Sequence, residues 1–383
     1  MAEYFRRFNY VMFFAMLALI AVGTVSIWSA GNARAELVFH GMWKQTLATA
    51  SVGLVLYFVL SAVDYRRILD RCAIPAYAGA IAILVAVLVF GAKIYGGRRW
   101  LWFFQPSEIS KLCVIMFMAQ FGGFMHRLGF KGFLLAGVAA GVPMLLILAE
   151  PDLGTTLTLA PAILVMMFAA RIWRRGLFAI LAIVMVAGGA VMGAVYAAEK
   201  PGVSEEKRAA IRKFIPLKDH QIKRVKVFLF PEEDAMGAGY NLRQAKISIG
   251  SGGFTGKGIG KGETNHLKYL PQSISMNDFI FCVYAEETGF VGSLALLVLF
   301  GLVVFPGAWT AFTANDGRGE CLAIGVSMLV FAHVYINIAM SIGLVPITGL
   351  PLPFISSGRT FLVTVMAALG MVQSVAIHRE ERV

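Results

Sequence analysis

Long apolar runs separated by short polar connections dominate the chain. Ten of these runs are candidate membrane spans, because about 20 apolar residues suffice to cross a bilayer. Their approximate limits are 8–30, 43–63, 73–92, 107–125, 132–149, 154–170, 176–198, 278–306, 321–345 and 352–377. The period-2 alternation of lipid-exposed barrel strands does not occur in the sequence, so the spans are expected to be helices. The pattern predicts an all-α integral membrane protein with about ten transmembrane helices.

Basic residues in the short connections set the predicted orientation. With a cytoplasmic N-terminus, the inner connections carry thirteen Lys and Arg residues, against five on the outer side. This asymmetry places both termini in the cytoplasm. Residues 199–277, between the seventh and eighth spans, then form one large extracytoplasmic loop. We expect residues 1–383 to be a single polytopic membrane domain that includes this loop.

Composition agrees with a membrane protein and adds a net positive charge. The chain is 58% hydrophobic and 15% charged, and its 34 Lys and Arg against 22 Asp and Glu give +12. Such an excess suits an anionic bilayer surface or an anionic substrate. Most cations lie in connections between apolar runs, so membrane lipids are expected partners and nucleic acid is not. The four cysteines lack C-x-x-C spacing and predict neither a zinc site nor a disulfide framework.

The long loop contains two distinctive stretches. Residues 206–228 have helical periodicity, which fits either a basic amphipathic segment on the membrane surface or a solvated charged loop. Residues 249–262 contain seven glycines but match neither the P-loop nor the dinucleotide-binding pattern. The backbone amides of this stretch, with Lys257 and Lys261, would suit a phosphate. A plain glycine linker is the alternative.

Several carboxylates stand where predicted spans meet the outer face. Asp278 lies at the start of the eighth span, and Glu286 and Glu287 follow about two turns further along. Glu108 and Asp152 begin the fourth and sixth spans. An acid at such a boundary is a functional-site hypothesis by default. Capping of a helix start is an equally open interpretation for Asp278, Glu108 and Asp152.

Prolines and glycines interrupt residues 346–360, at the mouth of the last span. Such backbone is tolerated at membrane depth only where it is buried in protein or lines a wet cavity. Arg359 lies in this stretch and needs a carboxylate or phosphate partner. His333, inside the ninth span, is expected to be a hydrogen-bonded packing residue. Together, the outer acids and cations predict a polar site for an anionic, lipid-linked substrate.

Five ordered motifs resemble a known family. They are QPSE at 105–108, PDLGT at 151–155, IGSGG at 249–253, DFIF at 278–281 with the following Glu pair, and GLPLPFIS at 349–356. In this order they are similar to the SEDS family (shape, elongation, division and sporulation), which includes RodA and FtsW, and the turn at 64–66 favours the RodA branch. The resemblance implies a multi-pass protein of the bacterial plasma (inner) membrane that acts in cell elongation and shape, or in division.

The implied activity is that of a peptidoglycan glycosyltransferase. Such an enzyme polymerises lipid II into β-1,4-linked glycan strands at the outer face, releases undecaprenyl pyrophosphate, and works with a class B penicillin-binding protein, which is a transpeptidase. Because the sugar centre is inverted, one carboxylate acting as general base would suffice. A transporter that moves a lipid-linked precursor across the bilayer (a flippase) is the alternative function, since intramembrane charges and a broken last span also suit it.

The resemblance also implies roles for single residues. Asp278 falls on the essential aspartate of the family and is expected to be the catalytic base, kept ionised by a helix dipole. Glu108 and Asp152 border the same cavity and would suit a divalent cation, Mg²⁺ or Mn²⁺, whereas Glu286 and Glu287 are expected to be structural. The residues expected to bind substrate or pyrophosphate are Lys257, Lys261, Lys268, Arg98, Arg99, Arg359 and Ser356.

Two departures from the family pattern stand at this site. Asp278 comes seven residues after Pro271, where five are common, and the His-Thr pair before the aspartate is missing. After Pro-Phe-Ile, family members usually continue with Ser-Tyr-Gly-Gly-Ser, but here residues 356–360 read Ser-Ser-Gly-Arg-Thr. Arg359 could therefore supply a new phosphate contact or a structural ion pair.

Overall fold

The computed structural model describes residues 2–32, 41–94, 97–101, 104–150, 152–200, 202–213, 215, 217, 219–234, 237–263, 270–271 and 275–379. Within these ranges nearly all regular structure is helical, as the apolar pattern predicts.

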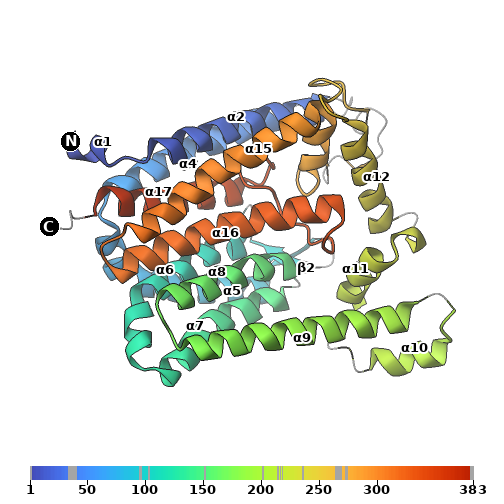
Figure 1. Cartoon of the computed structure of the whole chain (residues 1–383), viewed down its shortest axis with the longest axis horizontal. Helices are drawn as coiled ribbons and strands as arrows, with labels where there is room; N and C mark the ends of the chain where they lie inside the picture. The colour runs from blue at the N-terminus through green and yellow to red at the C-terminus, as the bar shows by residue number, and fades with distance from the viewer. Residues whose placement is uncertain are drawn as a thin grey trace.

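Ten long helices form the body of the molecule and run roughly alongside one another (Figure 1). They are α2 (Tyr10–Asn32), α4 (Met42–Ala62), α5 (Tyr65–Phe90), α6 (Pro106–Arg127), α7 (Phe130–Ala149), α8 (Leu153–Ala169), α9 (Arg174–Glu199), α15 (Ile280–Phe312), α16 (Gly317–Ile342) and α17 (Arg359–Ile377). Nine of these described helices are long and apolar enough to cross a membrane. The tenth, α8, has 17 residues, about 25 Å at ~1.5 Å per residue. Each predicted span is a helix, and the chain is a multi-pass membrane protein.

Two helix starts differ from the predicted limits for local reasons. The α5 helix begins eight residues earlier than expected, because the Asp64 side chain accepts a hydrogen bond of 2.9 Å from the backbone amide of Arg66 and caps a polar first turn. The α17 helix begins later, at Arg359, because the prolines at 351 and 353 keep the preceding backbone out of helix.

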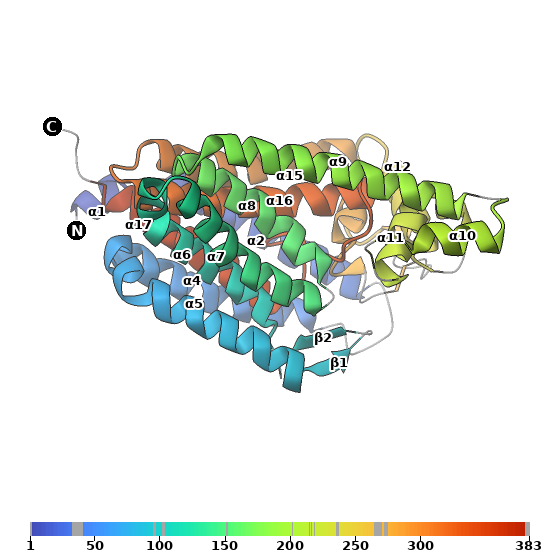
Figure 2. The same ribbon diagram turned by 90° about the horizontal axis from the view of Figure 1, so that it is seen from below.

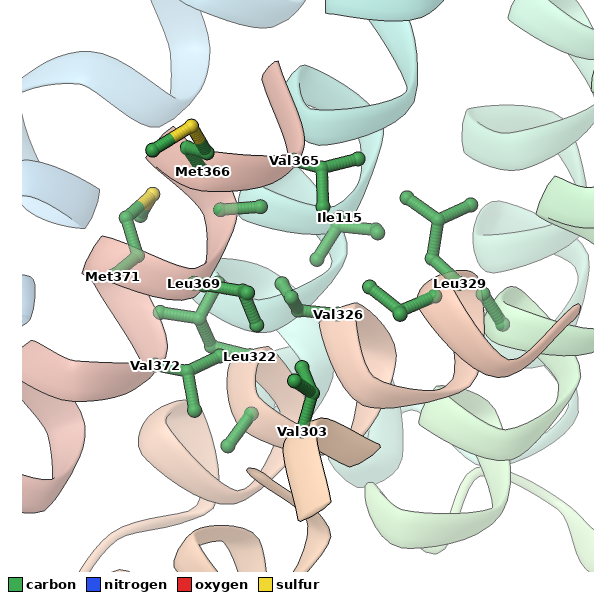
Figure 3. Close-up of a cluster of buried hydrophobic side chains, with 14 of the residues drawn as sticks. Ile115, Val303, Leu322, Val326, Leu329, Val365, Met366, Leu369, Met371 and Val372 are labelled. Atoms are coloured by element: carbon green, nitrogen blue, oxygen red, sulfur yellow. The ribbon is translucent and has the colours of Figure 1, made fainter. Parts of the chain in front are cut away.

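The core of the bundle lies around α16 and α17. In the most apolar stretch of α17, 89% of the residues are buried, whereas the corresponding fraction for α9 at the periphery is 6%. Figure 3 shows side chains of α6, α15, α16 and α17 meeting in this core, among them Ile115, Val303, Val326 and Leu369. The small residues of α17 allow neighbouring helices to approach closely, which is how transmembrane helices usually pack.

The two ends of the bundle differ. The short α1 (Ala2–Arg6) and the end of α17 lie at one end (Figure 1), and we call the opposite end the outer end, following the predicted orientation. The outer end carries a hairpin of β1 (Ala92–Ile94) and β2 (Gly97–Trp100), paired antiparallel. It also carries α10 (Glu205–Arg212), α11 (Asp219–Leu229), the 3₁₀ turn η1 (Pro231–Glu233) and α12 (Ala238–Ser251).

The start of the long loop folds against the projecting end of α9 (Figure 2). The predicted periodicity of residues 206–228 is confirmed by α10 and α11. Ile215 and Ile222 are buried in a small hydrophobic cluster with Val195 of α9. The loop is therefore tied to the membrane body at this point by apolar contacts.

The α15 helix is broken at Gly289, where φ is +68° and ψ is −163°. The glycine-rich segment, residues 252–262, inserts its backbone into this break. The amides of Lys257 and Gly258 donate to the carbonyls of Glu286 and Glu287 at 3.0 and 2.9 Å. The amides of residues 290 and 291 donate to the carbonyls of residues 253 and 254 at 2.9 and 3.2 Å. The glycines thus serve close backbone packing, which neither sequence interpretation anticipated.

Candidate functional site

Asp278 lies at the outer end, in the 276–279 turn directly before α15. Its backbone carbonyl accepts a hydrogen bond of 2.9 Å from the Asn337 side chain of α16. Gly349, with a φ of +72°, lets the 346–351 connection pass close to the carboxylate, since a Cβ built there would lie 3.4 Å from Oδ2 of Asp278. The backbone of Asp278 is therefore anchored to α16, and its carboxylate lies beside the proline-rich connection.

Two serines at the mouth of α17 hold the residue before Asp278. Ser356 Oγ donates to the Asn277 carbonyl at 2.6 Å and accepts from the Leu352 amide at 2.7 Å. Ser357 Oγ donates to Oδ1 of Asn277 at 2.5 Å. Ser356 was expected to bind substrate, but it is buried and both hydrogen bonds are internal. It positions the turn that carries Asp278.

Charges on three other elements act on the Asp278 carboxylate. Arg224 on α11 and Arg99 on β2 attract it, whereas Asp152 before α8 repels it. Burial raises the pKa of Asp278 to about 6, because removing the charged form from water outweighs the two arginines. Burial therefore acts against the helix dipole that was expected to keep Asp278 ionised. Asp278 is consequently a better base than a fully solvated aspartate.

Arg224 is the site residue that the sequence did not single out. Its Nη1 donates a hydrogen bond of 3.1 Å to the Thr348 carbonyl, so α11 reaches back to the connection beside Asp278. Burial, followed by repulsion from Arg99, lowers its pKa, while Asp152 and Asp278 act in the opposite direction. Within the loop Arg224 is one cation among fourteen. No local pattern marks it, and only the fold brings it to the site.

Glu150 adds a buried carboxyl group to the same region. The Arg99 Nε donates a hydrogen bond of 3.2 Å to its backbone carbonyl. Burial, with repulsion from Asp152, raises the pKa of Glu150 to about 8, although Arg99 opposes the shift. At neutral pH this carboxyl is mostly protonated. Glu150 therefore adds no full negative charge to the site, and the two arginines there face only the carboxylates of Asp278 and Asp152.

Glu108 is buried in the first turn of α6 and faces the bundle. Its Oε2 lies 2.8 Å from the Lys111 Nζ, an ion pair between neighbouring turns of one helix. The same ammonium lies 2.8 Å from Nε2 of His333 on α16. His333 is fully buried, in line with its expected role as a packing residue. Glu108 is thus engaged in a polar link between α6 and α16.

Asp152 caps α8 with both carboxylate oxygens. Its Oδ1 accepts from the Thr155 amide at 3.1 Å, and its Oδ2 accepts from the Thr155 hydroxyl at 2.8 Å and from Gln105 Nε2 at 3.0 Å. Among the described residues no three His, Cys, Asp or Glu side chains group around a common point. With Glu108 paired to Lys111, these two acids do not fit a protein-only cage for a divalent cation.

Lys257 was expected to bind pyrophosphate, but the structure gives it a different partner. Its Nζ lies 2.8 Å from Oε1 of Glu286, which is buried, and 3.4 Å from Oε2 of Glu263. Glu286 also accepts from Ser248 Oγ at 3.1 Å. Lys257 therefore secures the glycine-rich segment to α15. Glu287, hydrogen-bonded to Ser29 of α2, makes a comparable link to the first span.

Of the other predicted cations, the structure describes the side chains of Arg99, Lys261 and Arg359. Lys261 and Arg359 are exposed, and Arg359 has no ion pair with any described residue. Lys268 lies outside the described residues, as does the side chain of Arg98. Of the predicted anion-binding residues that the structure describes, Arg99 alone acts on Asp278.

The fold and this site define a polytopic helical membrane protein with a carboxylate and two arginines at one end of the bundle. The sequence model of the FtsW/RodA/SpoVE family, described as cell cycle protein, matches residues 9–381. The chain therefore belongs to this family.

Similar proteins include the peptidoglycan glycosyltransferase MrdB of Escherichia coli K12, which is 35% identical over 96% of this chain and 93% of its own length. A probable peptidoglycan glycosyltransferase FtsW of Trichlorobacter lovleyi is 33% identical over 97% and 93%. Among solved structures, one chain of a peptidoglycan synthase complex that coordinates polymerization and crosslinking has a TM-score of 0.74. It is 25% identical and covers 97% of this chain and 98% of its own length.

Proposed function

We propose that the chain is a peptidoglycan glycosyltransferase that polymerises lipid II into β-1,4-linked glycan strands at the outer face of the bacterial plasma membrane. Family membership and relatives named for this activity support the reaction class. The observation that carries the site is the Asp278 carboxylate, which lies beside the 346–351 connection and is attracted by Arg99 and Arg224. A lipid-linked substrate fits because the site lies at one end of a bundle of apolar helices.

The proposed chemistry is a single displacement. Asp278 takes the proton of the acceptor C4 hydroxyl, and the oxygen attacks C1 of the donor sugar. The bond from C1 to the pyrophosphate oxygen breaks, and undecaprenyl pyrophosphate leaves with the electron pair. Arg99 and Arg224 stabilise the charge that develops on the leaving group. The α-linked donor becomes a β-1,4 bond, so a covalent intermediate is unnecessary.

The cation requirement is a separate proposal. Because Glu108 and Asp152 are occupied by protein donors, we propose that Mg²⁺ or Mn²⁺ enters with the substrate pyrophosphate. Mg²⁺ is commonly held by substrate phosphates with one or two carboxylates, rather than by a cage of protein ligands.

We also propose a class B penicillin-binding protein as the partner. The structural neighbour from a peptidoglycan synthase complex supports this assignment, since crosslinking there is coordinated with polymerization. A partner that crosslinks new strands would use the polymer that this site releases.

The decisive experiment replaces Asp278 by Asn in purified protein reconstituted with lipid II. Loss of the base should lower the rate of glycan polymerisation by about 10²–10⁴-fold. The matched control is Asp219→Asn, an exposed aspartate at the start of α11, which should polymerise normally. Near-normal strand length and rate with Asp278→Asn would rule out the assignment. Transport of lipid II without strand formation by the unaltered protein would instead favour the flippase.

A further inference from the structure

A cavity of about 610 Å³ lies at the end of the bundle that carries the termini. The chain before α2, the end of α15 and the end of α17 form its walls, and Figure 1 shows both termini at this end. Three arginines from the two ends of the chain line it: Arg6, Arg7 and Arg379. None of the described residues that line the cavity is acidic. The cavity is therefore a concentrated positive site, remote from Asp278 along the bundle.

An aromatic stripe forms the lipid-facing side of the cavity. Phe305, Trp309 and Phe312 recur on one face of α15 and are 75%, 68% and 75% exposed. Exposed aromatic residues near the end of a spanning helix are typical of the zone between lipid headgroups and acyl chains. The predicted orientation assigns this zone to the cytoplasmic leaflet. The cavity thus offers an apolar side to acyl chains and a basic side to a headgroup.

Two hydrogen bonds connect other parts of the cavity wall to α15. Arg379 Nη1 donates to the Thr313 hydroxyl at the end of α15 at 2.9 Å. Asn9 Nδ2 approaches the Pro306 carbonyl at 3.5 Å and connects the start of α2 to α15. Guanidinium groups present several donors in a planar arrangement that matches phosphate oxygens. Basic pockets between spans on the cytoplasmic side are a recurrent way to bind anionic headgroups.

We propose that this cavity binds the phosphate headgroup of an anionic phospholipid from the cytoplasmic leaflet, with the acyl chains lying along the aromatic stripe of α15. The site is independent of the glycosyltransferase site, because it lies at the other end of the bundle and shares no residue with it. Charge complementarity and the position of the aromatic stripe select a lipid over a soluble anion.

The test measures binding of phosphatidylglycerol and phosphatidylcholine to the purified full chain by native mass spectrometry. The variant Arg6→Gln/Arg7→Gln/Arg379→Gln should lose about tenfold or more in affinity for phosphatidylglycerol, and little for phosphatidylcholine. The matched control is Arg171→Gln/Arg174→Gln/Arg175→Gln. It removes the same charge from a second basic surface of the described chain, located between α8 and α9. This control should keep the affinity of the unaltered protein.

A second variant tests whether lipid binding depends on the shape of the cavity as well as on its charge. Ala308 lines the cavity, and Ala308→Phe would reduce its volume without removing a cation. It should also weaken phosphatidylglycerol binding, and glycan polymerisation by the same sample verifies folding. If the two triple variants lost equal affinity for phosphatidylglycerol, the lipid would be attracted by surface charge in general and the proposal would be overturned. Binding that appears only after Glu380→Gln/Glu381→Gln would identify the acidic end of the chain as the occupant, and would also overturn it.

Discussion

Opposing electrostatic effects meet at the Asp278 carboxylate. Burial raises its pKa to about 6, while Arg224 and Arg99 hold back that rise. The ionised form is the base, so the polymerisation rate should fall as the pH drops through about 6 and level off above it. Removing Arg224 should raise the pKa of Asp278 further and shift this acid limb to higher pH.

The corresponding measurement is the pH dependence of polymerisation for Arg224→Gln and its neighbour Lys223→Gln, which changes an exposed cation on the same helix. Arg224→Gln should lower the plateau rate about tenfold or more, since it also removes a donor to the leaving group. Lys223→Gln should keep the profile of the unaltered protein. An unmoved acid limb in Arg224→Gln would show that Arg224 does not act on the base.

Removal of divalent cations distinguishes a substrate-held ion from a resident one. EDTA should reduce polymerisation of lipid II, and Mg²⁺ or Mn²⁺ should restore it. The unfolding temperature of the substrate-free protein should not change, because a metal that is not bound to the free protein does not stabilise it. A drop in the unfolding temperature with EDTA would indicate a resident ion and contradict the proposal.

At the residue scale, the sequence predicts those charged groups whose position along the chain is energetically costly. Asp278 was predictable because a carboxylate at the edge of an apolar run is costly. Arg224 was not, because a cation in a basic loop costs nothing and carries no local signal. The partner of Lys257 was not predictable for a related reason: Glu286 is 29 residues away, and the sequence does not show which charges will pair.

An ion pair connects the first half of α15 to the glycine-rich segment. Glu286 is almost fully buried, so Lys257→Gln leaves a buried charge without its cation and should destabilise the protein by about 3 kcal/mol. Lys261→Gln, at an exposed position in the same segment, should leave stability unchanged. Unfolding in detergent without substrate provides the measurement. Equal stability of both variants would contradict the structural role of Lys257 and favour its role as a substrate contact.

Helices were the most predictable elements, because apolar length alone specifies a span. Their ends were less predictable, as α5 and α17 show, since caps and prolines move a boundary by several residues. The break in α15 had no recognisable signal. A glycine such as Gly289 is ordinary in a membrane helix, and its positive φ depends on the distant segment that packs against it.

At the scale of the whole molecule, the site depends on how the long loop attaches to α9. Ile222 holds α11 against α9, and Arg224 lies two residues further along α11. Ile222→Asp should detach α11 and lower polymerisation toward the level of Arg224→Gln, while the bundle itself unfolds at its usual temperature. Ile259→Asp, a matched change at a residue that is 56% exposed, should be tolerated. Full activity of Ile222→Asp would show that α11 reaches the site by other contacts.

The structural class of the protein was predictable from its sequence, because a bilayer permits only helices or closed barrels as spanning structures. The arrangement of the helices around the core was not predictable, since nearly every helix is apolar on all sides and α9 resembles α17 in composition. Their burial nevertheless differs widely. Only packing separates a central helix from a peripheral one.

The backbone bonds that join residues 252–262 to the break in α15 have a consequence for sequence variation. Because the main chain makes these bonds, most side chains in the segment contribute nothing to them. Residue type is constrained at the positive-φ glycines 253, 256, 258 and 260, at Gly252, where a Cβ would clash with the Ala285 carbonyl oxygen, and at Lys257, which pairs with Glu286. The number of residues between the two contact points is constrained as well. Sequence differences among orthologues in this segment should therefore be substitutions at its unconstrained positions, and insertions or deletions should be rare.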